Sequence, residues 1–271
     1  MGTATMSESD RTIVIEVRMA NHAAHYRSGQ LHTTVRGMCG RYVSTTPPDQ
    51  MAQYFGAVVA PELLLAPSYN VAPTNDVYAV VARGNELVLD AFHWGLVPMW
   101  AKDTKIGSKM INCRSETIAE KPSFKSAFSK RRCIIPVDGF FEWKVLPDGK
   151  SKQPMFIQRV DHEPLAFAGL WEVWKGADRN ASEALHSNTI ITTTANEDMK
   201  AIHDRMPVLL PASKWNEWLD PTNHDIETLG KLLVPAPAGL LTMYPVATAV
   251  GNVRNKSADN IVPIEPSTLF S

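Results

Sequence analysis

The chain has 271 residues, of which 44% are hydrophobic and 20% are charged, and its formal net charge at pH 7 is −1. This is the composition of an ordinary globular protein with a sizeable core, and it excludes a protein that is polycationic throughout. Apolar runs stay well below the ~18 residues of a membrane-spanning helix, so we expect a cytoplasmic protein with no membrane partner.

Residues 1–37 differ from the rest of the chain. They contain scattered Ser, Thr, His and Arg with little periodicity, and they lack the apolar centre of a signal peptide. We interpret them as a disordered extension, a propeptide, or a segment upstream of the true start of translation. The folded domain is predicted to cover 38–271.

The first predicted helix follows Pro47 and Pro48, which suit a helical first turn, and Met51, Tyr54 and Phe55 continue at helical spacing. Two β-rich runs then flank a four-residue polar segment and predict a hairpin. The predicted elements after the helix are the hairpin strands 77–82 and 87–92, strands at 133–137, 155–160, 165–171 and 189–194, a short helix at 212–219, and a last strand near 240–246. Strands and helices do not alternate, which favours a β-rich α+β domain over a doubly wound parallel sheet.

Positive charge is concentrated in one part of this nearly neutral chain. Residues 101–132 contain nine Lys or Arg and three acids, a local net charge of +6. Such a cluster is typical of a phosphate-binding face, and an ordinary solvated surface is an equally good explanation from charge alone.

The sequence contains three cysteines, Cys39, Cys113 and Cys133, which are widely spaced and form no C-x-x-C pair. This pattern argues against a disulfide framework and against a structural zinc site. We expect buried or free thiols at Cys113 and Cys133. No metal or organic cofactor is predicted.

Reactive side chains gather in four short segments, 38–42, 111–117, 136–143 and 202–207. Each has an ordinary explanation when taken alone. Glu142 suits a carboxylate paired with a nearby cation, His203 a structural histidine, and Asn112 a turn former. Together the segments offer a Cys, a Glu and a His, which is the set required for a nucleophile with acid–base support.

In their order and spacing, these four segments resemble the SOS response-associated peptidase family, the abasic-site processing proteins. The resemblance extends from Met38 to about Pro263, and it is supported by the stretches 69–73, 94–100, 192–196 and 250–255. With it we expect an α+β fold, namely a single β-rich domain with a barrel-like core of mostly antiparallel strands and a few short helices.

The resemblance also implies roles for particular residues. The implied catalytic residues are Cys39, Asn112, Glu142 and His203. The implied DNA-binding residues are Arg41, Asn70, Pro73, Trp100, Arg114 and Arg205. The expected partner is single-stranded DNA containing abasic sites, bound by a monomer that associates with the nucleoid when on DNA.

The implied reaction requires Cys39 to be the first residue of the mature chain. A free α-amine has a pKa of about 7.7–8.0, so part of it is neutral at pH 7 and forms a Schiff base with the aldehyde of an opened abasic sugar. The thiol of the same residue then closes a five-membered thiazolidine, which gives a covalent DNA–protein crosslink in DNA damage repair. Glu142 and His203 would exchange protons, Asn112 would hydrogen-bond the amine or the sugar, and Trp100 would stack on an unpaired base.

This chain departs from the family pattern because 38 residues precede Cys39. Translation from Met38 followed by methionine removal would expose the amine. Cleavage before Cys39, including self-cleavage, would do the same. Two further functions remain open from the sequence: an N-terminal-cysteine peptidase that acts on other proteins, and a non-covalent module that binds single-stranded DNA.

Overall fold

The computed structural model describes residues 39–61, 64–176 and 184–265, so the expectation for residues 1–37 lies outside the described residues. The strands in the described ranges are β1 (Tyr42–Ser44), β2 (Val58–Val59), β3 (Ser68–Val71), β4 (Asp76–Arg83), β5 (Glu86–Trp94), β6 (Asn112–Arg114), β7 (Arg132–Val137), β8 (Gly139–Val145), β9 (Lys152–Arg159), β10 (Leu165–Trp174), β11 (Leu185–Thr194), β12 (Arg205–Pro207) and β13 (Leu241–Pro245). The α-helices are α1 (Pro48–Phe55), α2 (Pro122–Lys130), α3 (Glu197–Lys200), α4 (Trp215–Leu219) and α5 (Ile226–Gly230).

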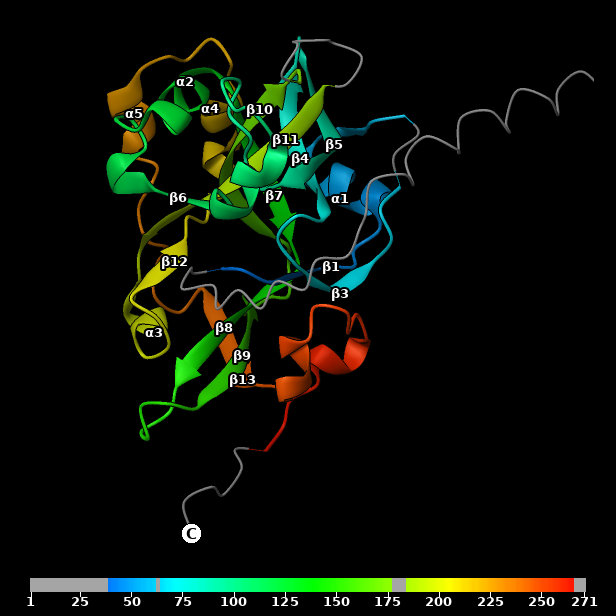
Figure 1. The fold of residues 1–271 in the computed structure, drawn as a ribbon, viewed down its shortest axis with the longest axis vertical. Helices are drawn as coiled ribbons and strands as arrows, with labels where there is room; N and C mark the ends of the chain where they lie inside the picture. The colour runs from blue at the N-terminus through cyan, green and yellow to red at the C-terminus, as the bar shows by residue number, and fades with distance from the viewer. Residues whose placement is uncertain (1–38, 62–63, 177–183, 266–271) are drawn as a thin grey trace, which may run out of the picture. The chain divides into compact units, whose positions relative to one another are not determined.

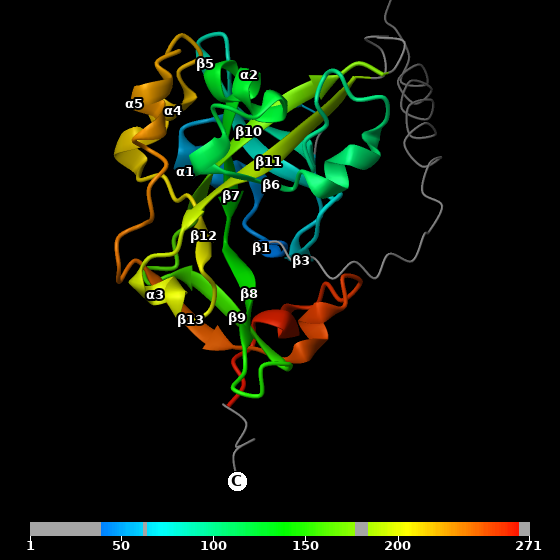
Figure 2. The same ribbon diagram turned by 60° about the vertical axis from the view of Figure 1, so that its left-hand side comes forward.

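Five strands close into a barrel in the order β4, β5, β11, β10, β7 and back to β4. The pairing of β5 with β11 is parallel, and the other pairings of the ring are antiparallel. These strands form the upper part of the molecule in Figure 1 and are seen from another side in Figure 2. The predicted α+β fold, a β-rich domain with a barrel-like core, is confirmed.

The barrel strands are apolar on both faces, and their residues alternate between two cores. On β7, Cys133, Ile135 and Val137 belong to one buried cluster, whereas Ile134 between them belongs to another. Successive side chains of a strand point to opposite faces, so one face fills the barrel and the other is covered by helices. This double burial explains why the strands appear in the sequence as continuous hydrophobic runs.

A second sheet, in the order β13, β9, β8, β1 and β3, is antiparallel throughout. Its strands β8, β9 and β13 form the lower part of Figure 1. The two sheets are in contact where Tyr42 of β1 packs on Trp94 of β5, with the ring centroids 5.1 Å apart. The candidate catalytic residues lie on both sheets, so this junction positions the site.

The helices cover the barrel with short amphipathic faces. On α2, Phe124, Ala127 and Phe128 are buried at helical spacing. The first predicted helix is α1, and Gly56 ends it at φ 63°, a left-handed conformation that glycine adopts without strain. The predicted hairpin is β4 and β5, while β7, β9, β10, β11, β13 and α4 match the other predicted elements. No helix among the described residues is long and apolar enough to cross a membrane.

Candidate functional site

Cys39 lies three residues before the start of β1 and is fully buried. Its backbone nitrogen donates a hydrogen bond to Glu142 Oε1 at 2.5 Å. Its φ of 49° is in the left-handed region, which costs a non-glycine residue roughly 1–2 kcal/mol. Strain of this kind persists only where the surroundings impose it, and it is concentrated at functional sites. The fold therefore holds the nitrogen of Cys39 against one carboxyl group.

Glu142 is in the middle of β8 and is 4% exposed. Burial raises the pKa of its carboxyl to about 7, although the N–H groups of Cys39 and Trp143 and the charge of Lys152 act in the opposite direction. A carboxyl with this pKa is present in both protonation states near neutral pH. It is therefore suited to exchange protons with the nitrogen that it contacts.

Burial, and to a smaller extent the charge of Glu142, raise the pKa of the Cys39 thiol well above its usual range. In this state the sulfur is a neutral thiol and a weak nucleophile, because the thiolate is the reactive form. Of the nitrogen and the sulfur of Cys39, the nitrogen is thus the atom held against a carboxyl group. A thiol that reacts second, after the nitrogen, fits this environment.

Asn112 begins β6, which runs parallel to β11 and places Asn112 opposite Ile190. The preceding residue fixes this strand, because Ile111 O accepts hydrogen bonds from Trp94 Nε1 and from Ile190 N, both at 3.0 Å. Ile111 also belongs to the same buried cluster as Cys39. The segments 38–42 and 111–117 therefore contribute residues to the same buried cluster.

Arg41 and Asn70 bind the chain near its C-terminal end. Arg41 Nη1 donates to Asn70 Oδ1 at 3.1 Å and to Val250 O at 2.9 Å, and its guanidinium lies 5.8 Å from the centre of the Trp143 ring. Asn70 is fully buried, and its Nδ2 donates to the carbonyls of Val250, Asn252 and Asn255 at 2.9–3.1 Å. In this structure both side chains hold the 250–255 loop in place.

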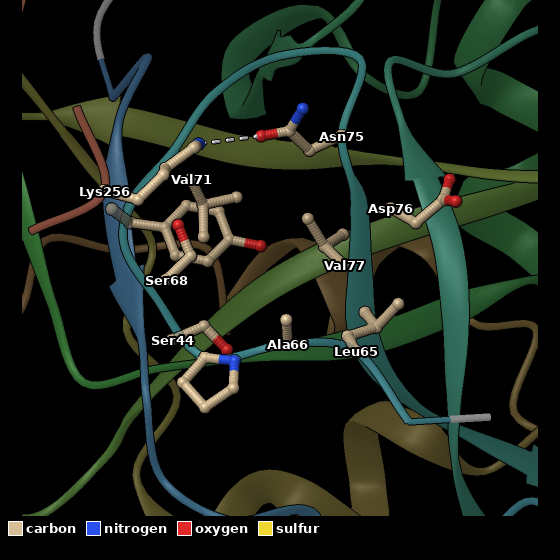
Figure 3. Close-up of a pocket in the computed structure, with 11 residues that line it drawn as sticks. Ser44, Leu65, Ala66, Ser68, Val71, Asn75, Asp76, Val77 and Lys256 are labelled. Atoms are coloured by element: carbon tan, nitrogen blue, oxygen red, sulfur yellow. Dashed lines mark hydrogen bonds between the residues drawn. The ribbon is translucent and has the colours of Figure 1, made fainter. Parts of the chain in front are cut away.

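The same network continues to Lys256, whose amine donates to Asn70 O and also to Asn75 Oδ1; Figure 3 shows the contact with Asn75. Asn75 also closes the turn that contains Pro73, since its Oδ1 accepts from Ala72 N at 3.1 Å and its N donates to Ala72 O. Pro73, another expected DNA-binding residue, is half-buried in this turn. The 250–256 loop and the 72–75 turn are thus joined through side chains.

We predict that Asn70→Ala lowers the free energy of unfolding by about 1–3 kcal/mol, because three carbonyls lose a donor in a buried site. The melting temperature should fall by roughly 2–4 °C for each kcal/mol. Differential scanning calorimetry measures this directly. Asn252→Ala is the control, since it changes the same loop and keeps the backbone carbonyl that Asn70 contacts. Equal melting temperatures for both variants and the parent would contradict a structural role for Asn70.

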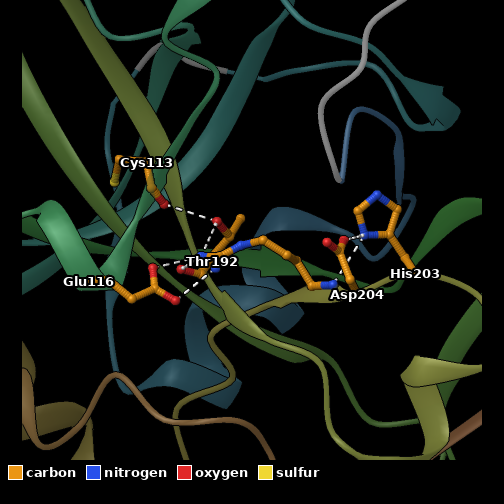
Figure 4. Close-up of polar contacts among 6 residues, drawn as sticks. Cys113, Glu116, Thr192, His203 and Asp204 are labelled. Atoms are coloured by element: carbon orange, nitrogen blue, oxygen red, sulfur yellow. Dashed lines mark hydrogen bonds and ion pairs between the residues drawn. The ribbon is translucent and has the colours of Figure 1, made fainter.

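His203 follows α3 and is partly exposed. Its Nδ1 lies 3.1 Å from Arg205 N and 2.8 Å from Asp204 Oδ1 (Figure 4). The neutral ring accepts from Arg205 N–H, and the protonated ring donates to Asp204, so each protonation state has a partner. Burial lowers the pKa of the imidazole, against the opposing effect of Asp204. The positive charge of Lys152 lowers the pKa of both His203 and Glu142, so one lysine interacts electrostatically with both side chains.

The remaining three expected DNA-binding residues differ in how available they are. Arg205 is engaged, because its Nη1 and Nη2 donate to Glu116 at 2.7 and 3.0 Å, and Nη2 also donates to Thr192 O (Figure 4). Arg114 is exposed opposite Thr192 on the edge of β11. Trp100 is 59% exposed.

The structure adds residues that sequence reasoning missed. Lys152 and Asp204 modify the charge environment of Glu142, and Glu116 binds Arg205. Asp204 and Glu116 lie inside the same reactive sequence segments as His203 and Asn112, so both acids could have been found from the sequence. Lys152 lies in an unremarkable polar stretch with no such signal. No group of three or more His, Cys, Asp or Glu within residues 39–61, 64–176 and 184–265 is arranged to hold a metal ion.

Comparisons with known proteins agree with this arrangement. The model of the SOS response associated peptidase (SRAP) family matches residues 38–253. The abasic site processing protein YoqW of Bacillus subtilis is 44% identical over 225 residues, which is 83% of this chain and 99% of the relative. YedK of Escherichia coli, which has the same description, is 31% identical over 84% of this chain and 100% of its own.

The fold is also shared with solved structures. A crystal structure of a Bacteroides thetaiotaomicron protein superimposes with a TM-score of 0.69 and 26% sequence identity, over 78% of this chain and 93% of that one. A Bordetella bronchiseptica protein superimposes with a TM-score of 0.65 and 27% identity, over 77% of this chain and all of the other. The family match covers the described fold from Cys39 through the 250–253 segment that Arg41 and Asn70 hold. The chain therefore belongs to the SOS response associated peptidase family.

Proposed function

We propose that this protein processes abasic sites in single-stranded DNA by forming a covalent bond through Cys39. The relatives reported above are named for abasic sites, which supports the substrate. The observation that carries the proposal is the 2.5 Å contact between the nitrogen of Cys39 and the buried carboxyl of Glu142. A mature chain beginning at Cys39 would have its α-amine at this position.

The proposed reaction joins one aldehyde to one aminothiol with the loss of one water. The amine nitrogen adds to the aldehyde carbon, and the Glu142 carboxylate takes the proton that this nitrogen releases. The protonated carboxyl passes this proton to the aldehyde oxygen, which becomes a hydroxyl. Glu142 then transfers the second proton of the nitrogen to this hydroxyl, which leaves as water and gives the imine. The thiol adds across the C=N bond, so that sulfur bonds to carbon and the thiol proton passes to nitrogen.

His203 and Asn112 have supporting roles in this proposal. The sugar of an abasic site is mainly a closed ring, and opening it requires a proton to move from the C1 hydroxyl to the ring oxygen. His203 has a partner for Nδ1 in both protonation states, and Figure 4 shows its other ring nitrogen turned away from Asp204. We assign this proton transfer to His203, and hydrogen bonding to the amine or the sugar to Asn112.

The amine becomes available only when no residue precedes Cys39. A start at Met38 supports this step, because cysteine is small enough for the preceding methionine to be removed, and the family match begins at Met38. Self-cleavage of the bond before Cys39 is the alternative route. The strained φ of Cys39 and the carboxyl beside its nitrogen are the features that favour it.

Binding of the DNA backbone is assigned to exposed cations, Arg114 above all. We predict that Arg114→Ala weakens the affinity for single-stranded DNA, and that it reduces the slope of log K against log salt concentration by about 0.7, the value for one phosphate contact. Titration by fluorescence anisotropy at several salt concentrations measures both. Lys231→Ala, which removes a cation outside the basic stretch, should leave the slope unchanged. Weaker binding with an unchanged slope would assign Arg114 a structural role.

Intact-mass spectrometry tests the proposed function. The natively expressed protein is measured before and after mixing with single-stranded DNA that contains one abasic site. We expect a mass that corresponds to a chain beginning at Cys39, and a stoichiometric increase that survives denaturation. A chain beginning at Cys39 that binds this DNA without any covalent increase would instead indicate a non-covalent binding module. Cleavage of added peptides without a DNA adduct would indicate a peptidase that acts on other proteins.

A further inference from the structure

A cavity of about 310 Å³ lies beside β1, β3 and the start of β4, and none of the four proposed catalytic residues lines it. Figure 3 shows side chains from these strands, from the 65–67 segment and from Lys256 facing this space. Its volume is near the lower end of the ~300–1,000 Å³ that ligand pockets occupy. The cavity is thus large enough for one small ring system and too small for a length of nucleic acid.

The lining combines apolar walls with polar groups of both kinds. Leu65, Val71 and Val77 supply aliphatic surface, and Tyr42 supplies an aromatic ring with a hydroxyl. Tyr42 is 1% exposed, so its hydroxyl is a polar group in a nearly closed environment. No hydrogen bond from another described residue reaches that hydroxyl, which leaves it available to a ligand that enters the cavity.

The charges at the cavity argue against an anionic ligand. The Lys256 amine is on one side, where it already donates to Asn70 O and Asn75 Oδ1. Asp76 is also part of the lining, and its carboxylate, which lies 3.8 Å from His93 Nδ1, adds a negative charge at the rim that disfavours a phosphate or a carboxylate. A neutral, flat ring with both donors and acceptors satisfies this lining better, because it can lie against the aliphatic walls and hydrogen-bond to both kinds of group.

The cavity is close to the candidate crosslinking site along two routes. Tyr42 is three residues after Cys39, a separation of at most about 10 Å along an extended chain. Asn70 joins the two regions, because its side chain accepts from Arg41 while its carbonyl accepts from Lys256. Bases stacked at 3.4 Å per step span 10 Å in about three steps. A base near an abasic nucleotide held at Cys39 is therefore within reach of the cavity.

We propose that this cavity takes one unpaired nucleobase of the bound strand, within about three nucleotides of the abasic site. The inference rests on the proposed function for the choice of DNA as ligand, and it adds a second subsite that fixes the strand by a base. Recognition there is by shape and by contact with the apolar walls, so we expect any base to enter, with purines favoured because their apolar surface is larger.

The test uses single strands in which an unreactive tetrahydrofuran replaces the abasic sugar, so that binding by the full chain stays reversible. A second base-free nucleotide is placed at one flanking position at a time, and the dissociation constant is measured by fluorescence anisotropy. We expect removal of the base at one position to weaken binding roughly tenfold, and removal elsewhere to have little effect.

Two variants connect this position to the cavity. Ala66→Trp fills it from an exposed lining residue without disturbing the buried core, and it should abolish the position-dependent loss. Tyr42→Phe should reduce that loss while keeping the ring. Val160→Trp, a substitution at an exposed site that does not line the cavity, should leave the profile of the parent chain.

The outcomes separate this inference from the proposed function, because adduct formation with a reactive abasic strand is scored independently on a denaturing gel. Suppose that the adduct forms but removal of the base weakens binding equally at every position, or that Ala66→Trp shows the same position dependence as the parent chain. Either result overturns the cavity as a base subsite and leaves the crosslink in place. A position-dependent loss that Ala66→Trp removes, without any adduct, supports the subsite and overturns the crosslink. Absence of measurable binding overturns the subsite.

Discussion

Replacing Cys39 with serine is expected to abolish the stable DNA adduct and to leave most of the affinity for single-stranded DNA. Serine keeps the α-amine, so a Schiff base still forms, but this imine hydrolyses because no sulfur closes the ring. Affinity should persist, since the exposed cations and Trp100 that are assigned to DNA binding remain. Denaturing gel electrophoresis measures the adduct, and anisotropy measures the affinity.

Cys113→Ser and Cys133→Ser provide matched controls for this prediction, because both are buried free thiols like Cys39. Each should form the adduct at the rate of the parent chain. A stable adduct in Cys39→Ser, or its loss in either control, would show that Cys39 does not supply the reacting sulfur.

Replacing Glu142 with glutamine is expected to slow adduct formation by roughly 10²-fold or more, which is the usual contribution of a positioned acid–base group. Glutamine keeps an acceptor for the nitrogen of Cys39 and cannot exchange a proton at neutral pH. In the parent chain the rate should rise with pH as the carboxyl ionises, and this step should be missing from the variant. Single-turnover rates between pH 5 and 9 test the prediction. Equal rates for the two chains at pH 7 would remove Glu142 from the mechanism.

The same substitution should make the protein more stable at alkaline pH. Burial raises the pKa of Glu142 to about 7 from an ordinary value of 4.5, so the unfolded chain releases this proton more readily than the folded one. The uncleaved chain, in which Cys39 N is in a peptide bond, therefore loses stability as the pH rises from about 4.5 to about 7. Above pH 7 the difference reaches about 3 kcal/mol.

Urea unfolding of the uncleaved chain and of its Glu142→Gln variant at pH 4.5 and pH 8 checks this sign. The two chains should be similar at pH 4.5, where the carboxyl is protonated in both the folded and the unfolded state, and the variant should be more stable at pH 8. A variant that is less stable at pH 8 would mean that the ionised carboxylate is stabilised in the fold. Together with the rate measurement, the result would show whether Glu142 raises the rate of adduct formation while lowering the folding stability.

Much of the barrel could be predicted from the sequence, because its strands are long and buried on both faces. The runs at 133–137 and 165–171 are apolar over most of their length, and the run at 189–194 consists of β-branched residues, so local pattern and tertiary environment agree. The hairpin of β4 and β5 was also predicted, because Gly84 and Asn85 lie between two such runs. Closure through the parallel pairing of β5 with β11 has no local signal.

The elements that carry the site were harder to predict. β6 and β12 have three residues each, which is too few for a periodic pattern. They form because each pairs with β11. α2 was not predicted, because its lysines belong to the basic stretch and its apolar stripe consists of only three residues, Phe124, Ala127 and Phe128. The sequence indicated the four reactive segments, yet only tertiary structure shows that the Cys39 nitrogen and Glu142 are in contact.

Arg41, Asn70 and Arg205 illustrate a different limit of sequence reasoning. The resemblance assigns all three to DNA, whereas the structure shows their polar groups occupied by the 250–255 loop and by Glu116. An arginine or asparagine side chain gives the same sequence motif whether it binds a ligand or a backbone carbonyl of its own chain. Nothing local in the sequence distinguishes the two.

The contact between Cys39 and Glu142 has a consequence for the order of events during synthesis. The two residues are 103 positions apart in the sequence. At a translation rate of ~5–20 residues per second, Cys39 leaves the ribosome roughly 5–20 s before its partner does. During that interval the segment around Cys39 has no carboxyl to bind and no barrel to bury it. Enzymes that trim the start of a nascent chain thus have access to this cysteine before the fold closes over it.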